Sequence, residues 1–182
     1  MTGRSSREVS ERHTIQLFVH GDNDREALEE FLEERYDVIA DSTLQPADCY
    51  LAGEQVVPTY RDALQEHKKE AHPTFIPVLL IRQEGSKGTV PRPSEQNGDG
   101  PPLIDEVVSA PVDRTTLFRR VENLLARREQ SVELSTRYED VQSRFQRLFD
   151  STNDAIFVVS PSGDEISECN PAACDLVGYS RD

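Results

Sequence analysis

Apolar runs and amphipathic segments alternate along the first two thirds of the chain. The apolar runs predict five strands, at residues 14–19, 36–40, 49–52, 76–81 and 103–108. Between them, apolar residues spaced three or four apart predict helices that begin near Asp22 or Asp24, near Val57 and near Asp113. Alternating strands and helices favour a parallel α/β sheet over residues 14–128. Five strands in this order suit the doubly wound, flavodoxin-like topology.

Two segments of the chain lack this alternation. Residues 1–13 are polar, and we expect them to form a disordered N-terminal tail. Residues 84–102 contain four glycines and four prolines. This composition predicts a mobile loop at the place where a further helix would be expected in such a fold.

A long helix is predicted after the fifth strand, because residues 115–149 contain neither Gly nor Pro. In the linker, residues 129–149, apolar residues alternate between spacings of four and three, as in a two-stranded coiled coil. Leu117 and Leu124 extend this spacing backwards through Ser131. The other apolar residues are one position out of step, and they are Phe118, Val121, Leu125 and Val132. We therefore expect the first part to pack on the sheet and the linker to form a parallel homodimer; the alternative is one amphipathic helix folded against its own domain. The predicted dimer residues are Leu134, Tyr138, Val141, Phe145 and Leu148.

The last part of the chain carries a motif of a different kind. After the stretch from Phe145 to Val159, Ser162-Gly163-Asp164 predicts a hairpin turn, and Glu168 to Ser180 completes the pattern. Residues 145–182 resemble the opening of a PAS domain. The residues assigned to this PAS motif are Asp154, Gly163, Asn170, Pro171, Gly178 and Tyr179.

This resemblance implies that residues 150–182 are the N-terminal part of a PAS domain, with two strands and one helix. The remaining strands and the central helices, which form most of the ligand pocket, are absent. Because a two-stranded hairpin alone is marginal in water, we expect this piece to be poorly ordered or packed on another chain, unless the natural protein continues past Asp182.

Residues 14–128 resemble a response-regulator receiver domain in the order of their elements. Residues 109–113, followed by Leu117, Val121 and Leu125, resemble the Lys-Pro turn and final helix that close a receiver. The stretch from Asp48 to Leu80 resembles the receiver-like N-termini of haloarchaeal sensor proteins. The resemblance implies chemistry at the carboxyl ends of the strands.

The residues expected at that site depart from the receiver pattern. Receiver chemistry needs two acids after the first strand to hold Mg²⁺, an Asp after the third, a hydroxyl after the fourth and a Lys after the fifth. This chain has no such set there. We therefore predict a degenerate pocket, a pseudo-receiver without catalytic residues; the alternative is a working phosphoacceptor that uses displaced acids such as Asp22, Asp24 or Glu54. The predicted pocket residues are His20, Gly21, Asp22, Ala52, Gly53, Glu54, Arg82, Ala110 and Pro111.

Charge narrows the range of partners. The net charge is −14, with 23 acids against 16 bases in residues 1–128 and 11 against 4 in residues 129–182. Such a field argues against nucleic acid or an anionic membrane as a partner. Only Lys68, Lys69 and Lys87 are lysines, and an acidic surface poor in Lys resembles proteins of salt-loving archaea.

The longest apolar run is much shorter than a membrane span, so we expect a soluble, cytoplasmic protein.

No cofactor or metal site is predicted. The three cysteines, Cys49, Cys169 and Cys174, are an odd set that implies no disulfide framework, and Cys169 and Cys174 lack further ligands for a metal. His67 and His72 are five residues apart and do not share a helical face, so we expect both on the solvated surface. No phosphate-binding Gly-rich motif or nucleophile elbow is present, so an enzyme is not predicted.

Together these patterns predict a non-catalytic signalling segment. It would comprise a pseudo-receiver that docks protein partners, a dimerising helix and the start of a PAS sensor domain, in a two-component sensor or regulator. Besides the displaced-acid phosphoacceptor, a small-molecule sensor that binds haem or flavin through the PAS domain is a further alternative.

Overall fold

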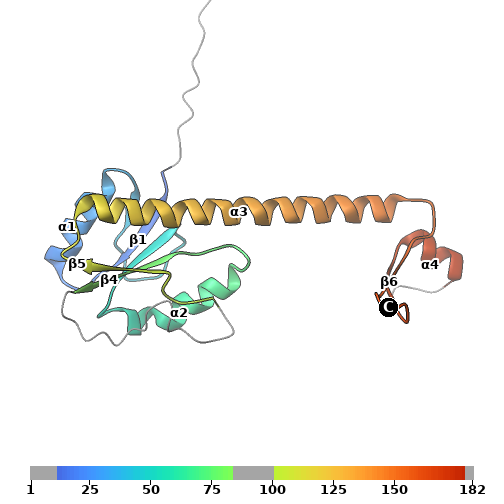
Figure 1. The fold of residues 1–182 in the computed structure, drawn as a ribbon, viewed down its shortest axis with the longest axis horizontal. Coiled ribbons are helices and arrows are strands. Elements are labelled where there is room, and N and C mark those ends of the chain that lie inside the picture. Colours follow the sequence, from blue (N-terminus) through green and yellow to red (C-terminus); the bar gives the residue numbers. More distant parts are fainter. Residues whose placement is uncertain (1–11, 84–100, 179–182) are drawn as a thin grey trace, which may run out of the picture. The chain divides into compact units, whose positions relative to one another are not determined.

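The computed structural model describes residues 12–83 and 101–178. The chain divides into two compact units, Met1–Val132 and Glu133–Asp182, which we describe separately (Figure 1). The predicted tail and most of the predicted loop, as residues 1–11 and 84–100, lie outside the described residues. Within the described ranges, no helix combines the length and the apolar character that crossing a membrane requires.

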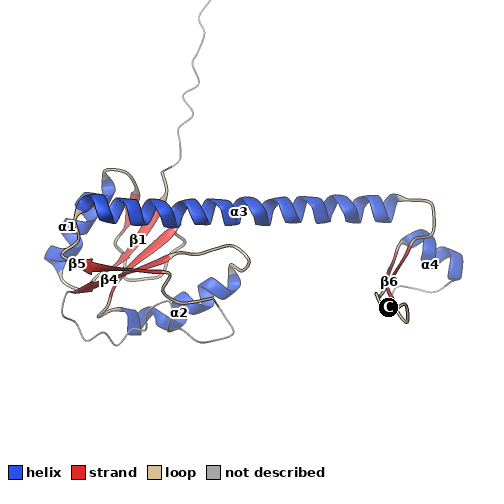
Figure 2. Ribbon diagram, viewed as in Figure 1, coloured by secondary structure: helices blue, strands red, loops and turns tan. Residues whose placement is uncertain are grey.

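The first unit is a five-stranded sheet with helices on both faces (Figure 2). Its strands pair in the order β2-β1-β3-β4-β5, and every neighbouring pair is parallel. The flavodoxin-like topology predicted from the sequence is therefore confirmed. The strands are β1 (Thr14–Phe18), β2 (Asp37–Ile39), β3 (Cys49–Gly53), β4 (Val78–Gln83) and β5 (Glu106–Ala110). The helices are α1 (Asp22–Glu33), α2 (Val57–Glu70) and α3 (Arg114–Ser151), which continues into the second unit.

Alternate residues of the central strands face opposite helices. Ile15, Leu51 and Leu79 belong to a core cluster with Leu32 of α1 and Leu117 of α3. The other face forms a second core cluster with α2. Because both faces are covered, the central strands are nearly continuous apolar runs. Each such side chain contributes about 1.5–3 kcal/mol to stability when it is fully buried. The second cluster includes Phe18, Tyr50, Ala52, Val57, Leu64, Val78 and Leu80.

Several predicted boundaries were wrong. The fifth strand is β5, Glu106–Ala110, and the fourth is β4, Val78–Gln83; each lies two or more residues beyond the predicted position. Leu103 and Ile104 are buried, but they precede the strand. An apolar run indicates which residues are buried, whereas the hydrogen-bonded pairing of β4 with β5 determines where the strand begins and ends. The second helix begins at Val57, as predicted, and ends at Glu70.

Helix α3 begins next to Asp113, near the predicted position, and Asp113 caps it, since its Oδ1 atom accepts a hydrogen bond from the Thr116 amide at 3.0 Å. Helix α1 begins at Asp22, as predicted, although neither Asp22 nor Asp24 caps it. Its N-cap is Gly21, while Asp22 and Asp24 lie in the first turn and make no side-chain cap. Acids in the first turn still interact favourably with the helix dipole.

In the second unit, α3 ends at Ser151 and is followed by a two-stranded antiparallel sheet and a short helix. These elements are β6 (Phe157–Val159), β7 (Ile166–Cys169) and α4 (Pro171–Val177). The chain turns between the strands at Gly163, whose φ of 77° is in the left-handed region that favours glycine. The hairpin and helix predicted from the motif are thus present.

Candidate functional site

A cavity of about 820 Å³ lies at the carboxyl edge of the sheet, where the parallel strands end. His20 follows β1, Glu54 follows β3, and Pro111 follows β5, so three separate loops contribute to its wall. Leu28 and Phe31 of α1 supply apolar surface. Crevices at the carboxyl ends of the strands are the usual ligand sites of open α/β sheets.

The predicted pocket residues divide into two groups. Five of them, His20, Gly53, Glu54, Ala110 and Pro111, line the cavity. The other four, Gly21, Asp22, Ala52 and Arg82, do not line it. Ala52 is fully buried in the core cluster beneath α2. Asp22 is 83% exposed, and its carboxylate forms an ion pair with Arg25 at 3.0 Å.

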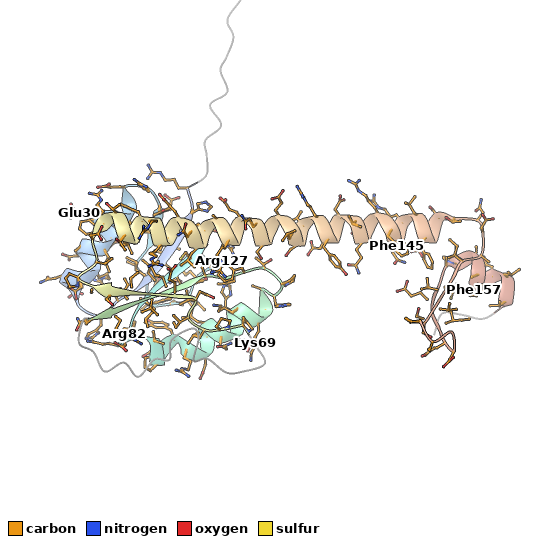
Figure 3. All side chains as sticks on the ribbon, viewed as in Figure 1. Glu30, Lys69, Arg82, Arg127, Phe145 and Phe157 are labelled. Carbon is orange, nitrogen blue, oxygen red and sulfur yellow. The ribbon has the colours of Figure 1, made fainter. Side chains whose placement is uncertain are left out.

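Glu54 and Arg82 form an ion pair at this edge. The distance from Glu54 Oε1 to Arg82 Nε is 3.2 Å, and the side chains are only 10% and 15% exposed, respectively. Arg82 lies near the carboxyl end of β4 (Figure 3). The third strand is one residue longer than predicted, so Glu54 directly follows it, and the Glu54 amide donates to the Ile81 carbonyl at 3.1 Å.

The pairing register places these two side chains together. Gly53 of β3 pairs with Ile81 of β4. The residues that follow them, Glu54 and Arg82, are therefore neighbours across the two strands. Side chains two positions apart on a strand face the same side of the sheet. Glu54 lies two residues after Ala52, and Arg82 two residues after Leu80, and both Ala52 and Leu80 face α2. Charges this poorly exposed stabilise each other only as a pair, because removing one leaves the other poorly solvated.

The remaining charge in the cavity is acidic. Asp24 reaches the cavity wall from α1 and joins Glu54 there. Ala110 stands at the end of β5, where the receiver resemblance would require a Lys. Among the residues that the structure describes, no group of three or more His, Cys, Asp or Glu side chains could hold a metal ion.

The opposite, amino edge of the sheet carries two polar contacts that the sequence did not reveal. Lys68 Nζ lies 2.6 Å from Asp105 Oδ2, and both side chains are at most 4% exposed. Burial lowers the pKa of Lys68 and raises the pKa of Asp105, and the attraction within the pair opposes both shifts. A signal was present in the sequence, since Lys68 lies four residues after Leu64 on the buried face of α2.

Asp48 joins the amino end of the sheet to α3. It accepts a hydrogen bond from the Thr14 amide at 2.9 Å and forms an ion pair with Arg128 at 3.1 Å. Burial would raise the pKa of Asp48, but these two contacts outweigh burial and hold that pKa below its ordinary value. Asp48 therefore has a structural role far from the cavity.

One surface prediction was wrong. His67 is half-buried, and its Nε2 atom lies 3.0 Å from the Tyr50 hydroxyl, with the two rings in an edge-to-face arrangement. His72 is exposed, as predicted. The spacing rule considered only contacts within one helix, whereas the partner of His67 is in β3.

The predicted dimer residues form an exposed apolar stripe on α3. Their exposed fractions range from 52% for Phe145 to 69% for Leu148. Ion pairs between residues four apart, Glu133 with Arg137 and Asp140 with Arg144, lie on the same part of the helix. In an isolated chain this stripe is exposed to water.

Asn170 is the polar centre of the second unit. It is fully buried, and its Nδ2 atom donates to the carbonyls of Phe149, Thr152 and Asp154 at 2.8–3.4 Å. Its Oδ1 atom accepts from the amides of Ile156 and Ala173, each at 2.9 Å. One side chain thereby joins the end of α3 to the start of β6 and to α4.

The other residues assigned to the predicted PAS motif make fewer contacts than Asn170 or lie at the ends of α4. Pro171 is the first residue of α4, and Gly178 ends that helix in the left-handed conformation. Asp154 contributes its carbonyl to the Asn170 contacts. Tyr179 lies outside the described residues.

Comparisons with known proteins agree with this division. Residues 143–182 match a family model described as PAS domain. No curated protein matches the chain. The solved structure of NtrX from Brucella abortus in complex with ADP is similar over 84% of this chain, with a TM-score of 0.55 and 16% identity. The similarity covers 33% of NtrX, so this chain spans about a third of that protein.

A response regulator receiver protein from Burkholderia phymatum is also similar, with a TM-score of 0.45 and 13% identity, over 63% of this chain and 96% of that one. Because this chain and NtrX are only 16% identical, their similarity concerns the fold alone. The chain thus has the flavodoxin-like receiver fold, followed by a long helix and a small antiparallel sheet.

Proposed function

We propose that this chain is a non-catalytic signalling segment of a cytoplasmic two-component sensor or regulator. A pseudo-receiver docks protein partners, the linker helix forms a homodimer, and the PAS segment belongs to a sensor domain. The observation that carries the proposal is the Glu54–Arg82 ion pair. Arg82 lies where the receiver resemblance would require the hydroxyl group, and Glu54 directly follows Ala52 and Gly53, where it would require the acceptor Asp.

The ion pair opposes phosphoryl transfer for a physical reason. An acceptor carboxylate must be free to attack phosphorus beside a bound Mg²⁺, which neutralises the charge of the phosphoryl group. Here the guanidinium of Arg82 lies beside the Glu54 carboxylate at 3.2 Å and already neutralises it. A metal ion would have to displace that cation.

The neighbouring positions support the same proposal. Gly21 has a φ of 96°, so an acid at this place would carry backbone strain. Ala110 supplies no ammonium group to stabilise a phosphoryl oxygen. Docking rather than chemistry is therefore the use of this scaffold that we propose.

Incubation with acetyl phosphate and Mg²⁺ tests the proposal. Intact mass spectrometry should detect no phosphoryl adduct on this chain, while an active receiver in a parallel reaction becomes modified. An adduct that maps to Asp22, Asp24 or Glu54 would overturn it.

A second candidate function has one observation in its favour. Asp24 and Glu54 line the same cavity, so two displaced acids could share a metal ion there. This phosphoacceptor makes the opposite prediction in the same experiment, with an adduct that is lost in Glu54→Gln or Asp24→Asn.

The acidic composition supports a further part of the proposal, an origin in a salt-loving archaeon. A net charge of −14 with only three lysines would cause strong self-repulsion at low salt. Concentrated salt would screen that repulsion.

A further inference from the structure

The sulfur atoms of Cys169 and Cys174 lie 3.4 Å apart. Cys169 is the last residue of β7, and Cys174 lies in α4, so the corner between these elements brings them together. Both residues are half-buried, and a small oxidant can therefore reach them. The spacing of four intervening residues did not reveal this contact.

A disulfide between them needs little movement. The bond is roughly 2.0 Å long, so sulfur atoms that lie 3.4 Å apart must approach by about 1.4 Å. Cys49 differs in every respect. It is fully buried in β3, and burial raises the pKa of its thiol. A buried, protonated thiol is a poor nucleophile, so Cys49 is an internal control.

We propose that Cys169 and Cys174 form a reversible thiol–disulfide site that responds to hydroperoxides. One thiolate attacks a peroxide oxygen, the O–O bond breaks, and a sulfenic acid and one molecule of water or alcohol result. The second thiolate then attacks the sulfenic sulfur, so that the S–S bond forms and the S–O bond breaks, and the oxygen leaves as hydroxide, which takes a proton from solvent to become water. Two electrons pass from the sulfurs to the peroxide, and a dithiol reductant reverses the change by exchange.

The position of the pair gives oxidation a structural consequence. Asn170 lies between the two cysteines in sequence, and its side chain joins the carbonyls of Phe149 and Thr152 to the amides of Ile156 and Ala173. A disulfide would brace the corner that holds Asn170. The redox state would thereby act on the contacts that hold the end of α3. This inference does not depend on whether the first unit is a pseudo-receiver.

The first test counts thiols in the full chain. The protein is treated with hydrogen peroxide, quenched, denatured and alkylated, and its mass is measured. We expect one alkyl group, on Cys49, after oxidation and three after reduction. Neither the Cys169→Ser nor the Cys174→Ser variant should form a disulfide within the chain, and the variant that keeps the attacking thiol should instead gain the mass of one oxygen atom as its sulfenic acid. Retention of three alkyl groups in the oxidised wild-type chain, or disulfides only between chains, would overturn the proposal.

A second test separates a built site from mere proximity in sequence. The equilibrium between dithiol and disulfide is measured against glutathione in native buffer and in concentrated urea. We expect the native fold to favour the disulfide by at least about tenfold, because it holds the sulfur atoms together. Equal constants in the two conditions would show that the fold contributes nothing and would overturn the proposal.

Hydrogen exchange tests the coupling to Asn170. The amides of Ile156 and Ala173 should exchange more slowly in the oxidised chain than in the reduced chain. The Cys169→Ser/Cys174→Ser variant, treated identically, should show no difference. Formation of the disulfide without slower exchange at either amide would refute this coupling.

Discussion

Glu54 Oε1 and Arg82 Nε lie 3.2 Å apart, at the carboxyl edge of a receiver-like sheet. Their exposed fractions of 10% and 15% place this pair between a surface salt bridge and a fully buried one. Glu54 also lines a cavity of about 820 Å³, so the pair is a structural contact and one of its two members belongs to the candidate site.

Breaking this ion pair should reduce stability. Arg82→Gln leaves the Glu54 carboxylate poorly solvated, and we expect a loss of about 1–3 kcal/mol in the free energy of unfolding. Glu54→Gln should cost a similar amount, and the double variant should cost less than the sum of the two. Urea unfolding at fixed salt measures all three. Arg25→Gln, which breaks the exposed Asp22–Arg25 pair, is the matched control and should cost less than about 0.5 kcal/mol. Additive effects of the two single variants would contradict a direct interaction.

Asp48 should make the free energy of unfolding depend on pH at acidic pH. Because its pKa is lowered in the folded protein, the ionised form stabilises the fold above about pH 4, and this contribution is lost as the pH falls through the folded pKa. We expect Asp48→Asn to cost about 1 kcal/mol at neutral pH, a value reduced by the partial exposure of this group, and progressively less towards pH 3.

The measurement compares urea unfolding of the two proteins between pH 7 and pH 3. His13 Nδ1 lies 3.6 Å from Asp48, so both proteins should also carry His13→Gln, which removes this neighbouring contact from the comparison. A difference between the proteins that stays constant with pH would show that Asp48 does not act through its charge.

The apolar stripe on α3 should hold two copies of the chain together. Light scattering after size exclusion should report a dimer. Leu134→Glu or Val141→Glu removes one apolar contact from each copy, worth about 1.5 kcal/mol or more per side chain, so dimerisation should weaken by at least about 100-fold. Ser143→Glu, placed away from the stripe by the heptad spacing, should leave the dimer intact. A wild-type chain that remains monomeric at every concentration tested would refute the coiled coil.

Stability should rise with salt. The net charge of −14 produces repulsion that acts over about 10 Å at 0.1 M salt but only about 3 Å at 1 M. We expect the urea midpoint to increase from 0.1 M to 2 M KCl. The variant Glu26→Gln/Glu30→Gln/Glu33→Gln, at exposed positions of α1, should show a smaller increase. An identical salt response in both proteins would indicate that the acidic surface is not the cause.

The periodicity of apolar residues was sufficient to predict the number and type of elements in the sheet unit and its flavodoxin-like topology. The spacing of apolar residues depends on whether an element is buried on one face or on both, and this spacing can be read locally. It was not sufficient for the start of β5. Leu103 and Ile104 are as apolar as a strand and fully or almost fully buried, yet backbone pairing begins only at Glu106.

Motif resemblance pointed to the carboxyl edge of the sheet, where the structure has a cavity. It did not predict what fills that edge. A shift of one residue in the register of β3 against β4 would place Glu54 on the opposite face from Arg82, so their contact depends on strand pairing that local sequence does not specify.

Residues that are distant in sequence depend on the fold even more strongly. Lys68 and Asp105 are separated by 37 positions, and the packing of α2 on the sheet brings them to 2.6 Å. Cys169 and Cys174 are near in sequence, but only the corner between β7 and α4 brings their sulfur atoms together. Local patterns specify which surfaces must be buried, whereas charge pairing and thiol contact require the three-dimensional arrangement of those surfaces.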